Sequence, residues 1–179
     1  MSELPKLGVL MAEYDKALAY TDELWKDLTQ EEVYWRPDEN SSAIGWHLGH
    51  QAVVAHFMVR NLTAAEPKID PRFDEMMDSA TPEPERTPLP PLHLIESFRA
   101  DVARRVHFRV GNINRGHVNA PTQLRSIATV MLTSIINHEY QHSKWIGEVR
   151  QGQFGHPLPD LPQSDLLSEI DGYAIIQLG

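Results

Sequence analysis

Four long segments of this chain repeat their apolar residues with the 3.6-residue period of an α-helix, and this pattern constrains the fold most strongly. The segments cover residues 5–28, 42–62, 91–112 and 124–151. The stripe of the first segment is formed by Leu7, Leu10, Met11, Tyr14, Leu18, Trp25 and Leu28. Two short connections and one long one join the four predicted helices. We therefore expect an all-α fold, a four-helix bundle with one long crossover connection.

Two histidines lie four residues apart in the fourth predicted helix, at His138 and His142. At about 100° per residue their rings share one face of the helix, one turn apart. This is the spacing with which a helix holds one metal ion. The helical projection places both in the middle of an apolar stripe, which comprises Ile127, Met131, Ile135, Trp145 and Val149. Because buried imidazoles need polar partners, a shared metal ion explains the pair.

The second predicted helix supplies the third candidate ligand. Its inward arc is formed by Trp46, Val53, Val54 and Phe57. His50 lies near the centre of this arc and His47 lies toward one edge, so we predict His50 as the ligand and His47 as the runner-up. For His50 alone, an alternative interpretation stays open, namely that it is a core histidine whose ring is hydrogen-bonded to a backbone carbonyl. The other histidines fall on polar faces or in loops and are expected to face solvent: His56, His93, His107, His117 and His156.

Three neutral imidazoles leave coordination positions open for water or substrate, as in a catalytic metal site. The chain has no cysteine, so thiolate ligands, disulfides and a cysteine nucleophile are excluded. This ligand set suits one divalent transition metal, with zinc or nickel favoured and iron(II) or copper also compatible. It does not favour magnesium or calcium.

Residues 138–142 read HEYQH and also match the HExxH pattern of zinc peptidases. In those enzymes the glutamate acts as general base on metal-bound water. Glu139, however, projects to the rim of the predicted apolar stripe. Trp145 and Glu148 stand where a metzincin has its glycine and third histidine. Glu169, the ligand that another zincin type would need, lies beyond a proline-rich break. We therefore reject the peptidase interpretation.

The long connection, residues 66–91, holds seven of the thirteen prolines and more acidic than basic residues. Loops of this length are uncommon in compact domains and often act as lids or binding loops. Two interpretations stay open: a plain crossover with one short helix near residues 74–78, or a shaped loop that borders the metal site.

The tail from Pro157 onward is apolar, with a candidate strand only in its last few residues. Such a tail packs on its own subunit or on a partner subunit. We predict a homodimer, with the tail folded back on its own subunit as the alternative. The whole chain, residues 1–179, is expected to form one domain with its core in residues 5–151 and a C-terminal tail in residues 152–179.

Net charge is −9, and no basic block occurs anywhere in the chain. This argues against nucleic acid and anionic membrane as partners. The N-terminal apolar stretch is too short for a signal peptide, and no run reaches transmembrane length. We therefore expect a cytoplasmic protein that acts on a small-molecule substrate.

Three motifs resemble the DinB/YfiT-like family of metalloproteins. They are residues 28–37 (LTQEEVYWRP), residues 41–50 (SSAIGWHLGH) and the 138–142 motif followed by residues 145–151 (WIGEVRQ). The resemblance implies a four-helix bundle, often dimeric, with His50, His138 and His142 as metal ligands. One departure is Ser143-Lys144-Trp145, where many members have Arg-Gly-Gln after the second histidine of the fourth helix.

The resemblance also implies a class of activity. The family includes S-transferases that use low-molecular-weight thiols such as bacillithiol or mycothiol, a thiol-dependent isomerase, and domains of sulfoxide synthases. A metal-dependent thiol transferase is thus the expected function. A metal-dependent hydrolase and a non-enzymatic, stress-related metal-binding protein remain as alternatives, which the residues do not separate. The catalytic residues stay unassigned.

Overall fold

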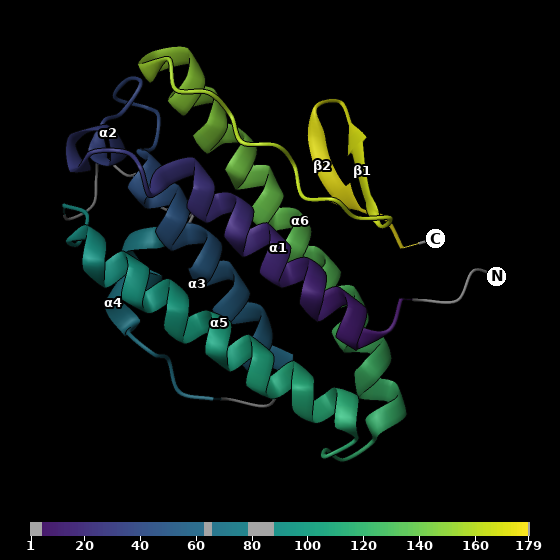
Figure 1. Ribbon diagram of the computed structural model, residues 1–179. Coiled ribbons are helices and arrows are strands. Elements are labelled where there is room, and N and C mark those ends of the chain that lie inside the picture. The colour runs from purple at the N-terminus through teal and green to yellow at the C-terminus, as the bar shows by residue number, and fades with distance from the viewer. Residues whose placement is uncertain (1–4, 63–65, 79–87, 179) are drawn as a thin grey trace.

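The computed structural model describes residues 5–62, 66–78 and 88–178. Four long helices form an all-α bundle, as the sequence predicts: α1 (Leu7–Trp25), α3 (Ile44–Leu62), α5 (Leu92–Arg115) and α6 (Pro121–Phe154). Two short helices, α2 (Gln30–Tyr34) and α4 (Pro71–Met77), lie in the connections. The chain ends in a hairpin of β1 (Leu167–Ile170) and β2 (Tyr173–Ile176) beside α6 (Figure 1).

The four long helices pack so that α1 lies along α6, while α3 contacts both α5 and α6 (Figure 1). The seam between α3 and α6 carries the predicted metal ligands. The interior is filled mainly by aliphatic side chains, including Leu10, Leu24, Ile44, Leu48, Ile95, Ile113, Leu132, Ile136 and Ile146. This burial of apolar area is the main favourable contribution to folding.

Local capping explains where the helices begin and end. The first helix ends at Trp25, before the expected residue 28, and Thr29 begins α2 with a capping box. The Thr29 hydroxyl accepts from the Glu32 amide at 3.2 Å, and the Glu32 carboxylate accepts from the Thr29 amide at 2.8 Å. At the other end of the chain, Gly155 ends α6 with φ 71°, a left-handed conformation that glycine adopts easily.

The crossover contains the short helix that the sequence predicts, at Pro71–Met77. The Asp70 side chain caps it by accepting from the Arg72 amide at 3.0 Å. Phe73 and Met77 are buried, and α4 packs on α3. Residues 79–87 of the proline-rich segment lie outside the described residues.

The tail folds back on its own subunit. Asp171 and Gly172, with φ 53° and φ 79°, form the tight turn of the hairpin. Ala174 and Ile176 are buried against α6. The tail therefore gives no reason to expect a dimer, although it was the motive for that prediction.

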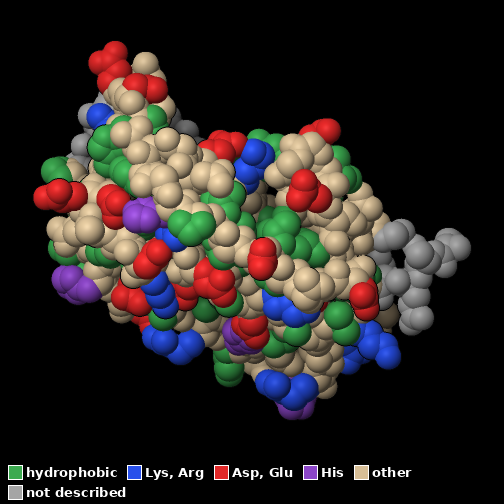
Figure 2. Space-filling view, turned by 45° about the horizontal axis from the view of Figure 1, so that its top comes forward, with side chains coloured by type: hydrophobic (Ala, Val, Ile, Leu, Met, Phe, Trp, Pro, Cys, Tyr) green, Lys and Arg blue, Asp and Glu red, His purple; other side chains and the backbone are tan. Residues whose placement is uncertain are grey.

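On the face shown in Figure 2, acidic and basic side chains are interspersed. Within the described residues, no helix combines the length and the apolar character needed to cross a membrane.

Candidate metal centre

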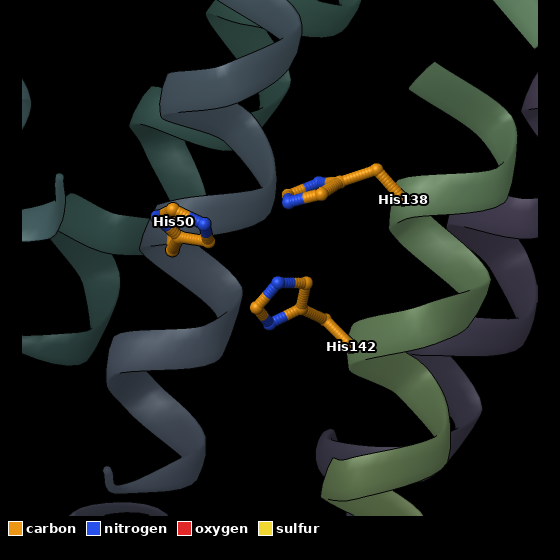
Figure 3. Close-up of side chains that lie close together, drawn as sticks. All are labelled: His50, His138 and His142. Atoms are coloured by element: carbon orange, nitrogen blue, oxygen red, sulfur yellow. The ribbon is translucent and has the colours of Figure 1, made fainter. Parts of the chain in front are cut away.

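His50, His138 and His142 converge in the seam between α3 and α6 (Figure 3). Their candidate ligand nitrogens all lie within 4.8 Å of one another. The closest ring centroids are those of His138 and His142, at 4.4 Å. His50 and His142 are buried, and His138 is partly exposed. The structure thus brings together the three side chains that the sequence predicts as ligands.

The orientation of His50 is fixed by the crossover. Its Nδ1–H donates to the Met77 carbonyl of α4 at 2.5 Å. With Nδ1 engaged in this way, Nε2 is the nitrogen that His50 offers as a metal ligand. The helices approach closely here because Gly49 has no side chain: a Cβ at this position would lie 2.9 Å from the Met77 sulfur. Through α4, segment 66–91 therefore lies against His50, as the interpretation of a loop that borders the site requires.

The orientation of His142 is fixed by the runner-up ligand. His47 Nδ1 lies 2.8 Å from His142 Nδ1, so one of the two nitrogens donates to the other. If His142 donates, its Nε2 is left for a metal ion, and His47 acts as an outer partner. Two tryptophans cover the rings: Trp46 stacks on His50 at 4.5 Å, and the edge of Trp145 meets His142 at 4.7 Å.

Three histidines of this seam, His47, His138 and His142, are held in the form that binds metals. Burial lowers the pKa of His47 and His138 to about 4, with repulsion from His50 as the second cause. Burial lowers the pKa of His142 to about 2, and His138, His47 and His50 lower it further. These side chains are therefore neutral near pH 7, and neutral imidazole is the metal-binding form.

A buried polar network lies directly behind the histidines and joins all four long helices. Arg99 of α5 donates to Glu139 Oε1 at 2.8 Å and to Gln51 Oε1 at 2.9 Å. Thr21 of α1 donates to Glu139 Oε1 at 2.7 Å and lies 2.8 Å from the Ser143 hydroxyl. Burial acts to lower the pKa of Arg99, but the Glu139 carboxylate outweighs it and raises that pKa above its usual value.

Each candidate ligand is followed in the chain by a member of this network: Gln51 after His50, Glu139 after His138 and Ser143 after His142. Successive helical residues point about 100° apart. When the histidine of such a consecutive pair faces the seam between α3 and α6, the residue that follows it therefore faces the bundle interior. Fixing the interior residue limits rotation of the helix and so limits where the histidine ring can lie.

This arrangement corrects the predicted orientation of α6. Glu139 was expected at the rim of the apolar stripe, but it is 3% exposed and lies in the bundle interior. His138 lies at the edge of the buried face, and Ile127, expected inward, is 54% exposed. The projection was centred on the two histidines, whereas the buried face of α6 is centred nearer Glu139 and Ser143. Likewise Phe57 of α3 is 60% exposed, not inward.

The peptidase interpretation is further weakened by the position of Glu139. Its Oε1 accepts hydrogen bonds from Arg99 and Thr21, which hold the carboxylate in the network. Within the described residues, no carboxylate belongs to the group formed by the three histidines.

The prediction that five further histidines face solvent is wrong for His56. It is 1% exposed, and its Nε2 lies 2.9 Å from the Arg105 guanidinium. Burial, with Arg105 as the next cause, lowers its pKa to about 4. His107 and His156 are partly exposed and bind Asp15 and Glu32.

Arg99 was missed from the sequence, although a signal for it exists. It occupies an inward position between buried Phe98 and Val102 on the apolar stripe of α5. A charged residue at such a position requires a buried partner of opposite charge. The sequence does not reveal which helix supplies that partner.

We predict that Arg99→Met lowers the free energy of unfolding of the metal-free protein by about 3–5 kcal/mol, because it leaves the Glu139 carboxylate buried without its partner. The double variant Arg99→Met/Glu139→Leu should regain much of this loss. Urea denaturation measures both.

Arg104→Met is the matched control on α5. Its guanidinium is exposed and pairs with Asp101, so the expected change is within about 0.5 kcal/mol. Additive effects of the Arg99 and Glu139 substitutions would contradict a coupled buried pair.

Comparison with known proteins agrees with the predicted fold. The sequence model of the DinB superfamily matches residues 13–146, a range that contains all three histidines of the group. A comparison with curated proteins finds no match. The chain is a member of the DinB superfamily.

Proposed function

We propose that this protein is a metal-dependent enzyme in which His50, His138 and His142 hold one divalent transition metal ion. The observation that carries the proposal is the convergence of three imidazoles in one seam, two of them oriented by outer partners. Such partners are typical of metal-binding histidines.

The residues fit an ion of this kind. Zinc binds imidazole nitrogen at about 2.0–2.1 Å, so two nitrogens on one ion lie at most about 4.2 Å apart. The group spans up to 4.8 Å, and small rotations of the rings close this difference. Three imidazoles and no carboxylate favour zinc or nickel, with iron also compatible, over magnesium and calcium.

We further propose that the protein transfers an electrophilic substrate group to the sulfur of a low-molecular-weight thiol. A bound divalent ion lowers the pKa of a coordinated thiol or water. A free thiol has a pKa of about 8.5, whereas that of water is about 15.7. A thiol therefore loses its proton with less help from a general base. Glu139, the acid nearest in sequence, is held by Arg99 and Thr21, so the site suits thiol chemistry better than hydrolysis.

We predict that the purified protein binds close to one metal ion per chain, measured by elemental analysis after loading and dialysis. His50→Ala and His138→Ala should lose the ion because each removes a direct ligand. His47→Ala should keep the stoichiometry but bind about 10–100-fold more weakly, because it removes an outer partner.

His117→Ala is the matched control, since His117 is exposed in the connection before α6. Equal metal content in wild type and His138→Ala would contradict the assignment. Loss of the ion from His47→Ala, with retention by His50→Ala, would exchange the roles of these two residues.

Activity should require both the ion and a thiol. We expect conjugation of bacillithiol, mycothiol or another small thiol with an uncharged electrophile by the metal-loaded protein. A chelated sample and His138→Ala should be inactive. Turnover of an ester or amide without thiol would favour the hydrolase instead. Metal binding without turnover of any tested pair would favour a non-enzymatic role.

We propose that the bundle and the tail form one domain. We also propose that two copies of the chain form a homodimer through the exposed apolar face of α3 and α6. Phe57, Ile127 and Val130 are all more than half exposed on this face. Phe57 and Ile127 line a hollow of about 440 Å³ between the two helices. Exposed apolar surface of this kind is typical of protein interfaces, and a two-fold axis would bring two copies of the face together.

Light scattering tests the dimer. Ile127→Glu should yield monomers, because it places a charge in the apolar face. Val9→Glu, an exposed apolar position on α1, is the control and should leave the dimer intact. Truncation after residue 158 should also leave it intact, since the tail packs on its own α6. A monomeric wild type would end this proposal.

A further inference from the structure

A hollow of about 420 Å³ opens directly beside His138. Its walls come from α3, α6 and the C-terminal hairpin and consist of Met58, Ser134, Asn137, His138, Gln141, Tyr173, Ala174 and Ile175. The volume lies within the range typical of small-molecule sites, about 300–1,000 Å³. The hollow therefore has the size and position of a substrate site next to the candidate metal centre.

The three rings of the centre differ in how they can be approached. Trp46 stacks on His50, and Trp145 and His47 contact His142. His138 is partly exposed and lines the hollow. A ligand held in the hollow therefore approaches the centre from the side of His138.

The outer wall of the hollow is clamped to the helix that carries the histidines. The Asn137 amide donates to the Ile176 carbonyl at 3.0 Å, and its oxygen accepts from the Ile176 amide at 2.7 Å. Asn137 directly precedes His138. A two-stranded hairpin alone is marginally stable, so this clamp and the burial of Ala174 and Ile176 on α6 keep the wall in place.

The chemistry of the lining points to an uncharged ligand. Among the described residues that line this hollow there is no lysine, arginine, aspartate or glutamate. Met58, Ala174, Ile175 and the ring of Tyr173 offer apolar contacts. A charged group that points away from the metal ion would lose hydration here without gaining an ionic partner from the lining.

We propose that this hollow binds the uncharged, mainly apolar part of the electrophilic substrate. Ile175 and Tyr173 of β2 limit the size of the substrate part that fits. This inference rests on the proposed metal-dependent function. Residues 167–176 lie outside the range matched by the superfamily model, 13–146. The wall is thus built by a part of the chain that the family match does not cover, which suits a role in substrate selection.

The test uses N1-substituted imidazoles, whose N3 coordinates a metal ion while the substituent extends from the opposite side of the ring. The full-length protein is loaded with cobalt(II), and binding is followed by the visible spectrum. From 1-methyl- to 1-propyl- to 1-butylimidazole, Kd should fall by up to about fourfold per methylene group, as expected for burial in an apolar site. A propanoate substituent should bind no more tightly than methyl.

Two variants of the hairpin locate the effect. Ile175→Trp should fill the hollow and abolish the dependence of Kd on substituent length, while Ile175→Ala should extend it to longer substituents. Ile170→Trp is the matched control, since Ile170 lies in β1, is 43% exposed and does not line the hollow. It should behave as wild type, and circular dichroism verifies the fold of each variant.

The outcomes separate the two proposals. If the cobalt spectrum responds to no imidazole in any variant, the metal centre itself is refuted, and this inference with it. If all imidazoles bind wild type with the same Kd, or if Ile170→Trp and Ile175→Trp behave alike, the metal centre stands and the role of the hollow is overturned.

Discussion

The buried pair of Arg99 and Glu139 is the interaction on which the arrangement of the site depends. Its members come from α5 and α6, and through Thr21 and Gln51 it extends to α1 and α3. A pair of charges in a protein interior is costly unless every partner is in place. The hydrogen bonds of the network therefore form in few alternative registers of the four helices. Because its members adjoin the three histidines in the chain, the same restriction sets the positions of the rings.

Much of the fold could be predicted from the sequence because the spacing of nearby residues determines where the helices form. Apolar residues at helical spacing predicted the four long helices, and Pro71–Met77 was expected within three residues of its true start. Spacing also brought His138 and His142 to one face. His50 followed from its place among the apolar residues of α3. These inferences use neighbours within a few turns of one helix.

The remaining features depend on contacts between distant segments. The partner of Arg99, the carbonyl that meets His50 and the burial of His56 are set by packing between helices. Helical projection also assumes that the apolar stripe and the histidines share a centre. In α6 they do not, because polar Glu139 and Ser143 occupy the interior in place of apolar residues. Hydrophobic pattern alone therefore placed the buried face about a quarter turn wrong.

The hydrogen bond from His50 to the Met77 carbonyl couples the crossover to the proposed metal centre. Coupling between two equilibria is reciprocal. Under the proposed function, a change that loosens α4 from α3 would weaken binding of the ion, and an ion that orders His50 would hold α4 more firmly in return. Gly49 permits this coupling by allowing the two helices to touch. Occupancy of the proposed centre between α3 and α6 would thereby be transmitted to a short helix on the outside of the bundle.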